Sequence, residues 1–325
     1  MRATETTEAG WDELVAATPA PHITQTHGWA ELKALTGWTA RRFRFDEGGV
    51  AQVLIKRLPL GLTVAYAPRG PLVPAERIGD AIAALRTALS ADRCASLLCD
   101  PEVRSDDALA QSLERAGIHR SPVFVQPRRT LLMDLGTEPE ALLAAMRKKT
   151  RQYIHKAERA GVVTEDTRDL DRFLRVLRVV AERDRFALHS REYFARVLET
   201  FGDRAHVLMS RVGDEDDGAM MLVRMGDRAW ELYGGWSGAH DEARPFYLLK
   251  WRAMMKMRAL GAKRYDMWGL ADRGADDPLA GVENFKLGFG GEIAEWIGAL
   301  ETPVRPLLYP VWQLAARRRL ARSAA

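Results

Sequence analysis

The stretch AHVLMSRVGDEDDGAMMLVRMGDRAWELYGG, residues 205–235, decides the fold. Its apolar runs predict strands over Ala205–Val212, Ala219–Met225 and Ala229–Gly234. Gly226-Asp227 lies between the last two runs, and a pair of this type is typical of a tight hairpin turn. The stretch therefore predicts consecutive strands, the last two of which form a hairpin.

A helix and a further strand are expected after this stretch, over Pro245–Leu260 and Arg264–Leu270. Before it, the pattern predicts a strand at Thr130–Leu135 and a long helix at Glu138–Ala160, and Ile293–Leu300 is expected to be a last strand. The first half of the chain has a similar order, with strands at Trp38–Phe45 and Val50–Leu58, a helix at Ala75–Ser90 and a strand at Cys94–Cys99. Strands, a helix and another strand, occurring twice, indicate a duplicated α+β unit, an order that suits the GNAT-type acyltransferase fold.

Length, charge and hydropathy limit the class of protein. A chain of 325 residues exceeds the usual size of one domain, so two domains of roughly 150 residues are expected. The net charge of +4 does not by itself indicate a nucleic-acid binder. Glu5 and Glu8 lie where a signal peptide would be basic and then apolar, and no apolar run is long enough to span a membrane. We therefore expect a cytoplasmic protein that can still touch the inner face of the membrane.

A basic segment from Lys148 to Val162 resembles the FemABX-type aminoacyltransferases, which carry a basic helix ending in Ala and Gly-Val. Further stretches agree in the family's order: Gln25-Thr-His-Gly-Trp29-Ala-Glu-Leu-Lys33 with Gly37-Trp38, then Tyr66-Ala-Pro-Arg69-Gly70-Pro71, then Tyr247 through Trp251 and Gly261 to Tyr265-Asp266 and Gly269, and finally Asn284-Phe285-Lys286-Leu-Gly-Phe289. The resemblance therefore covers residues 22–292.

The resemblance implies an α+β protein with two tandem GNAT-like domains, residues 1–130 and 131–302, and a tail, 303–325, packed on the first domain. No coiled-coil arm is expected, because no long heptad pair interrupts the second domain. The implied donor is aminoacyl-tRNA, and the implied acceptor is an amine of a nucleotide- or lipid-linked peptidoglycan precursor. We expect no cofactor or metal, and a monomer.

Aminolysis of an aminoacyl ester needs a neutral amine about 3 Å from the carbonyl, and positive charge where the oxyanion develops. Because the ester is already reactive, positioning and electrostatics suffice. The sequence has no nucleophile elbow, metal-spaced histidine cluster or Cys/His pairing that indicates another chemistry. The segment most similar to a CoA-pyrophosphate-binding motif is Arg258-Ala-Leu-Gly261-Ala-Lys263, which departs from the motif at its last position. The lack of this motif agrees with a tRNA donor.

Lys286 is the candidate catalytic residue. Phe285-Lys286 coincides with the family's Phe-Lys pair, whose lysine neutralises negative charge near the reacting carbonyl. The alternative is a lysine that extends from a helix into water. We expect substrate contacts from Phe285, Trp236 and Tyr247. Trp236 follows two glycines, which let a ligand approach the backbone, and Tyr247 lies near the start of a predicted helix.

The candidate acceptor-binding residues fall in three places. Lys33 matches the family lysine that binds the acceptor diphosphate, and Trp38 belongs to the same matched stretch. Arg69, in a stiff Pro-Arg-Gly-Pro turn, is expected to grip phosphate through two donors. A solvated helix face for Lys33 and a turn cap for Arg69 are the alternatives. Where the family often has Arg-Ser-x-x-Tyr this sequence has His189 and Tyr193, so the histidine favours an unusual acceptor.

Two basic segments remain. The first is expected to bind the tRNA backbone and carries Arg147, Lys148, Lys149, Arg151 and Lys156. The second, Val304–Arg322, mixes apolar residues with arginines and suits docking on the first domain or lying on an anionic membrane. Three other functions stay open: tRNA-dependent aminoacylation of a small-molecule or antibiotic amine, acetyl-CoA-dependent N-acylation, and non-catalytic binding of RNA or anionic lipid.

Overall fold

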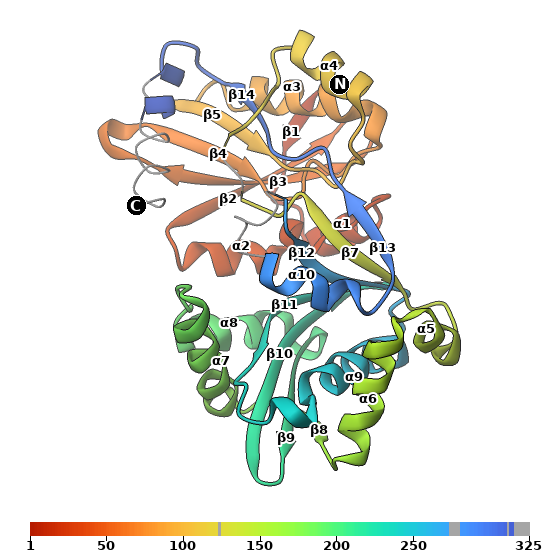
Figure 1. The fold of residues 1–325 in the computed structure, drawn as a ribbon. Helices are drawn as coiled ribbons and strands as arrows, with labels where there is room; N and C mark the ends of the chain where they lie inside the picture. The colour runs from red at the N-terminus through yellow and green to blue at the C-terminus, as the bar shows by residue number, and fades with distance from the viewer. Residues whose placement is uncertain (123–124, 273–279, 311, 315–325) are drawn as a thin grey trace. The chain divides into compact units, whose positions relative to one another are not determined.

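The computed structural model describes residues 1–122, 125–272, 280–310 and 312–314. The chain divides into two compact units. The first combines Met1–Arg128 with the chain that returns from Glu295, and the second is Arg129–Ala294. Each unit contains one sheet with helices on both faces (Figure 1).

The sheet of the first unit has the strand order β1-β2-β3-β4-β5-β14-β6. Its strands are β1 (Ala3–Glu5), β2 (Trp38–Phe45), β3 (Val50–Arg57), β4 (Thr63–Ala67), β5 (Cys94–Cys99), β14 (Leu300–Pro303) and β6 (His119–Arg120). Strands β2, β3 and β4 are antiparallel, whereas β4 and β5 are parallel. Helix α3 (Ile78–Ala88) makes the crossover between these parallel strands and buries Ile78, Ile82 and Leu85 in the core.

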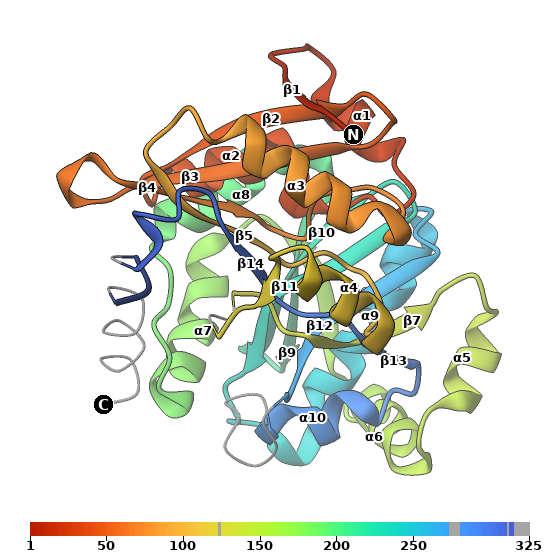
Figure 2. The same cartoon turned by 90° about the horizontal axis from the view of Figure 1, so that it is seen from above.

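Helices cover both faces of this first sheet. Helices α3 and α4 (Asp107–Arg115) lie on one face and α2 (His27–Ala34) on the other (Figures 1 and 2). The remaining helical segments of the unit are α1 (Trp11–Ala16), η1 (Ile23–Gln25), η2 (Pro59–Gly61) and η3 (Ala75–Arg77). Thr26 caps α2 by accepting from the Trp29 amide, which fixes the start of the helix that carries Lys33.

The sheet of the second unit has the strand order β13-β7-β12-β11-β10-β9-β8. Its strands are β13 (Glu292–Glu295), β7 (Arg129–Asp134), β12 (Arg264–Leu270), β11 (Arg228–Trp236), β10 (Glu215–Met225), β9 (Ala205–Val212) and β8 (Val163–Thr167). Strands β9, β10 and β11 form an antiparallel meander, and β11 is parallel to β12. In both units a parallel strand therefore follows three antiparallel strands and a helix, which confirms the predicted α+β fold with two units of the same order.

The helices of the second unit are α5 (Pro139–Ala145), α6 (Lys148–Arg159), α7 (Leu170–Asp184), α8 (Arg191–Phe201), η4 (Gly202–Arg204), η5 (Asp241–Ala243), α9 (Pro245–Ala259) and α10 (Ala280–Leu287). Helices α5, α6 and α9 share one core with the sheet, to which α9 contributes Leu249, Met254 and Met257. Helix α7 contacts β10 and β11 (Figure 1). Among the described helices α7 and α9 are the longest, at 15 residues each.

Two expectations about the second half need correction. The helix expected over 138–160 is interrupted, because Met146 and Arg147 are extended and the Arg147 amide donates to the Gly288 carbonyl (2.9 Å). The last strand expected over 293–300 is two strands, β13 and β14. Strand β14 pairs with β5 and β6 and buries Leu300 in the first unit, so residues 295–302 belong to that unit and not to the second.

The described part of the tail contacts the first unit. Arg305 donates to the Ser90 carbonyl through Nε (3.2 Å) and Nη2 (3.0 Å). The Trp312 indole donates to Glu301 Oε1 (2.8 Å). The tail beyond Leu314, with most of its arginines, lies outside the described residues. Within the part of the chain that is described, no helix has the length and apolar character needed to cross a membrane.

Candidate active site

Strands β11 and β12 of the second unit separate partway along their length. They pair at only three positions, from Arg228↔Arg264 to Trp230↔Asp266. Beyond this point β11 continues beside β10, whereas β12 continues beside β7. The pairing of β12 with β7 also contains a bulge between Asp266 and Gly269, in which Trp268 has a φ of 55°. The separation of the strands opens the sheet at this bulge.

Asp266 stabilises the bulge. Its Oδ1 accepts a hydrogen bond from the Trp268 amide (2.7 Å) and another from the Thr130 hydroxyl. Because the carboxylate is 5% exposed, the left-handed Trp268 is held by a partner that water does not displace. The carbonyls of Trp268 and Gly269 are thereby fixed toward α10.

Lys286 binds to these carbonyls. Its Nζ donates to the Trp268 oxygen (3.1 Å) and the Gly269 oxygen (2.7 Å). Burial, followed by the positive charge of Lys250, lowers the pKa of Lys286 to about 8, while Glu231 and Asp266 act in the opposite direction. An ammonium group has three donors, and among the described residues only these two carbonyls accept from it. Among the described residues, the third N–H of Lys286 has no acceptor.

A buried ion pair lies in the same gap. Lys250 on α9 and Glu231 on β11 are 3% and 8% exposed, and their side chains form a salt bridge. Tyr265 of β12 donates from its hydroxyl to Glu231 Oε1 (2.8 Å). Both carboxylate oxygens of Glu231 are thus bound.

Aromatic rings cover these charges. The Phe285 ring stacks on Trp236 and Phe246, with centroid distances of 6.0 Å and 5.5 Å. The Tyr247 ring packs edge-on against Phe285 at 4.8 Å. Lys250 Nζ lies 5.7 Å from the Phe285 centroid. The structure thus places Phe285, Trp236 and Tyr247 in one aromatic cluster beside Lys286, which follows Phe285 in sequence, and their contact with substrate stays a prediction.

His189 and Tyr193 lie in a second aromatic group of this unit. Their rings stack at 4.0 Å, and the Tyr233 hydroxyl donates to that of Tyr193 (3.2 Å). Burial raises the pKa of both tyrosines, so both remain neutral donors at physiological pH. Because Tyr233 is on β11, two residues beyond Glu231, this group adjoins the same strand as the lysine site.

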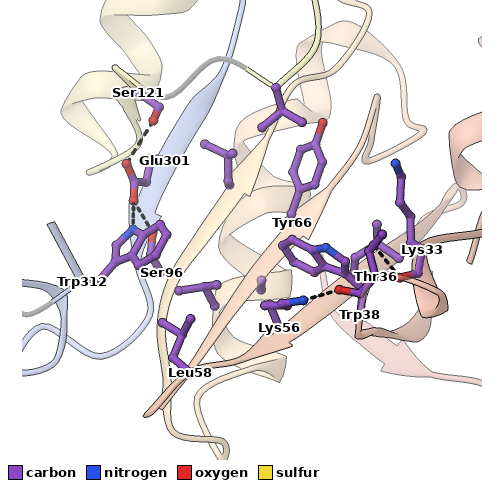
Figure 3. Close-up of a pocket in the computed structure, with 15 residues that line it drawn as sticks. Lys33, Thr36, Trp38, Lys56, Leu58, Tyr66, Ser96, Ser121, Glu301 and Trp312 are labelled. Atoms are coloured by element: carbon purple, nitrogen blue, oxygen red, sulfur yellow. Dashed lines mark hydrogen bonds between the residues drawn. The ribbon is translucent and has the colours of Figure 1, made fainter. Parts of the chain in front are cut away.

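The first unit has a cavity of about 430 Å³ on its sheet (Figure 3). Lys33 lies at one end, and Tyr66, Trp38 and Lys56 lie nearer the middle, with Lys56 Nζ 5.7 Å from the Trp38 ring centroid. Lys33 Nζ is 4.9 Å from the Trp29 ring centroid, and burial lowers the pKa of Lys33. Two lysines and two aromatic rings suit a ligand that has both phosphate and planar groups. The structure thus places Lys33 and Trp38 on one cavity.

Arg69 does not line this cavity. Its side chain is 5% exposed, and Nη2 donates to the Pro127 carbonyl (2.8 Å). Its amide and the Tyr66 hydroxyl donate to the two oxygens of buried Asp100, each at 2.6 Å. Burial raises the pKa of Asp100 to about 6. The sequence led us to expect that Arg69 binds phosphate. The structure instead buries its side chain, where it supports the loop behind Tyr66.

The opposite end of the cavity contains a carboxylate. Glu301 of β14 accepts from the Ser96 hydroxyl (2.6 Å), the Ser121 hydroxyl (3.1 Å) and the Trp312 indole (Figure 3). Three neutral donors stabilise this buried charge. The bond from Trp312 also holds the described part of the tail at this end of the cavity.

The predicted tRNA-binding residues are mostly on the open face of α6. Arg147, Lys148, Lys149 and Lys156 are exposed, and no described carboxylate pairs with them. Arg151 differs, because it is half-buried and donates to the carbonyls of Ala144 (3.0 Å) and Met146. It therefore closes the end of α5. No group of His, Cys, Asp and Glu suited to a metal occurs among the described residues.

Sequence reasoning missed Lys250, Glu231 and Asp266. Lys250 had a signal, because it is a single charge among the apolar residues Leu248, Leu249 and Trp251 on a helix buried nearly all round. Glu231 and Asp266 each interrupt an apolar strand. A charged residue inside a predicted core segment requires a buried partner.

Two sheets of the same order, a buried lysine beside a strand gap, and a cavity lined by lysine and aromatic residues define a tandem GNAT-like protein. The family model described as the FemAB family matches residues 6–216 and 218–317. The chain belongs to the FemAB family.

Individual relatives agree with this assignment. The lipid II:glycine glycyltransferase of Staphylococcus aureus strain MRSA252 is 29% identical over 208 residues, which cover 58% of this chain and 49% of that protein. The chain spans about half the length of the curated relatives that it matches.

Solved structures share the fold. The crystal structure of FemX has a TM-score of 0.84 at 22% identity, covering 97% of this chain and 99% of that one. A tandem GNAT protein from the clavulanic acid biosynthesis pathway has a TM-score of 0.51 at 17% identity, covering 94% and 99%. The predicted α+β fold with two GNAT-like units is confirmed.

Proposed function

We propose that this protein transfers an amino acid from aminoacyl-tRNA to an amine of a peptidoglycan precursor. The observation that carries the proposal is the placement of Lys286, held on two backbone carbonyls with one N–H free among the described residues. Membership of the FemAB family and the glycyltransferase relative support the choice of donor and acceptor.

In this reaction the neutral acceptor amine attacks the ester carbonyl, and the C–N bond forms as the bond to the tRNA ribose oxygen breaks. The proton that the amine loses goes to the departing ribose oxygen. Lys286 donates its remaining N–H to the oxyanion that develops, at a site where few water molecules screen the charge. The rings of Phe285, Trp236 and Tyr247 exclude water and contact the aminoacyl end.

The other groups are assigned to binding. Lys33 and Trp38 in the first-unit cavity contact the phosphate-bearing part of the acceptor, a role suited to a desolvated cation beside aromatic rings. The exposed cations of α6 follow the tRNA backbone. The stacked pair His189 and Tyr193 binds acceptor atoms through hydroxyl and ring contacts.

A second candidate acceptor is a small-molecule amine. It is favoured by His189, which occupies the place of the family's arginine and stacks on Tyr193, so this position lacks a permanent cation for a diphosphate.

The test combines radiolabelled charged tRNA with lipid-linked precursor, nucleotide-linked precursor and a panel of small amines, and uses acetyl-CoA as a competing donor. Transfer from tRNA to a precursor is expected. Label that moves only from acetyl-CoA would refute the proposal, and transfer only to small amines would select the second candidate. Lys286→Met should reduce the transfer rate ~100-fold or more, whereas Lys263→Met, on an exposed turn, serves as the matched control.

A further inference from the structure

Lys286 faces charged groups from every element that surrounds the strand gap. Glu231 comes from β11, Lys250 from α9 and Asp266 from β12. On its own helix, Glu283 is engaged by Arg129 of β7 (3.1 Å). The first three groups act on Lys286 electrostatically, and Lys250 opposes the two acids.

The Lys250–Glu231 pair is held in place on all sides. Glu231 is bound by the ammonium of Lys250 and by the Tyr265 hydroxyl, and Tyr265 is fully buried. Lys250 Nζ lies 5.6 Å from the Phe246 centroid and 5.7 Å from that of Phe285, the residue before Lys286. The pair therefore cannot swing away from the reacting lysine without moving the aromatic rings.

Packing does not explain why this pair is charged. The residues around Lys250 on α9 are apolar and buried, including Leu249, Ala253 and Met254. A buried ion pair is often no more stable than apolar side chains of the same volume. The charges therefore point to a role other than stability. Both partners act electrostatically on Lys286, and Lys250 Nζ lies against the ring of the preceding residue, Phe285.

We propose that Lys250, Glu231 and Tyr265 are positioning residues that set the charge of Lys286 during aminoacyl transfer. The inference rests on the proposed function of Lys286. Glu231 stabilises the ammonium form of Lys286, which donates a hydrogen bond to the oxyanion. Lys250 destabilises the same form and so keeps the acidity of the ammonium group from falling too far. Tyr265 fixes Glu231 so that the balance between the two charges is constant.

The test is the titration of Lys286 itself. Its protonation is measured at each pH from the extent of acetylation by trace acetic anhydride, read by mass spectrometry of the peptide that contains Lys286. Lys250→Met should raise the pKa of Lys286 by about one unit, and Glu231→Gln should lower it by a similar amount. Lys256→Met, a lysine of the same helix paired with Asp166 (2.8 Å), should leave it unchanged. Lys250→Arg keeps the cation and should restore the wild-type titration.

Shifts of opposite sign from the two partners of one ion pair are the supporting result. A purely structural pair predicts that both variants perturb the site in the same way, and a common direction or no shift in either overturns the proposal. Should a single variant fail to fold, the double variant Lys250→Met/Glu231→Gln, which leaves no unpaired charge, is used. The pKa of Lys286 in the double variant should be lower than in Lys250→Met and higher than in Glu231→Gln, because the double variant retains neither charge. A double-variant pKa equal to that of the single variant that folds also overturns the proposal.

The alkaline fall in transfer rate should move with the titration in each variant. Because acetylation needs no tRNA or acceptor, the two hypotheses are separable. If the wild-type protein transfers nothing from charged tRNA, the proposed function is refuted. If the pH dependence of Lys286 acetylation is the same in the variants as in the wild type, only the role of the ion pair is refuted.

Discussion

Replacing Lys286 with methionine should change how stability depends on pH. Burial, with Lys250, lowers the pKa of Lys286 from its ordinary 10.5 to about 8. Below pH 8 the folded and unfolded chains both hold the proton, so the folded protein bears the full cost of a desolvated cation. Between pH 8 and 10.5 the folded chain loses its proton first, and this cost is relieved as the pH rises.

The magnitude follows from proton linkage. Relative to Lys286→Met, the wild-type protein should gain about 2 kcal/mol in unfolding free energy between pH 7 and pH 9.5. The two carbonyls that lose their donor in the variant contribute a constant to the difference and do not affect its slope. Titrating groups that do not interact with Lys286 occur in both proteins and cancel.

The assay is equilibrium urea unfolding of both proteins at pH 7, 8, 9 and 9.5 at constant ionic strength. A difference in unfolding free energy that does not vary with pH would refute the reasoning, since it would mean that Lys286 is solvated in the folded protein. The same variant should lose ~100-fold or more in transfer rate, as expected on removal of an oxyanion donor. Wild-type transfer should decline above pH 8, where Lys286 loses its proton.

Three further predictions concern other parts of the chain. Gly291→Ala should lower the unfolding free energy by about 2 kcal/mol in urea titrations, because Gly291 has a φ of 86° and an added Cβ would meet the Leu132 oxygen at 2.6 Å; Gly281→Ala, with open space around it, is the neutral control. The double variant Lys148→Glu/Lys156→Glu should weaken tRNA binding measured by filter binding. The slope of log K against log salt concentration should fall by about one per lost phosphate contact. An unchanged slope argues against α6 as the tRNA surface. Lys33→Met should raise KM for the acceptor several-fold with a smaller effect on kcat in steady-state kinetics, whereas Arg57→Met, exposed beyond the cavity, should alter neither.

The repeated order of elements was predictable because strands and helices leave periodic apolar patterns. Strands β2, β5, β9 and β12 match the residues expected from the sequence. The break at Met146 was not predictable, since both flanking segments have helical patterns and the interruption depends on a contact with Gly288, distant in sequence. Strand β14 was placed in the wrong unit for a similar reason, because its partners precede it by about two hundred residues.

The site was predictable only where a motif marks it. Lys286 and Phe285 were found through the family pair, and Lys33 through a matched stretch. Arg69 looked like a phosphate ligand, yet its buried contacts with Pro127 and Asp100 depend on tertiary structure that a local motif does not encode. Asp266 could not be assigned, because its role is to hold the bulge that binds Lys286.

Three features around Lys286 reduce stability. Trp268 is held in a left-handed conformation, a charged pair is buried beside it, and Lys286 is an ammonium removed from water. Strained backbone and desolvated charges persist where function requires them, because a core maintained for stability alone would favour apolar side chains. The first-unit cavity has a different character, with half-buried lysines and aromatic rings and no such strained bulge among its described lining residues. This contrast favours the strand gap of the second unit as the place of acyl transfer and the cavity of the first unit as a binding site.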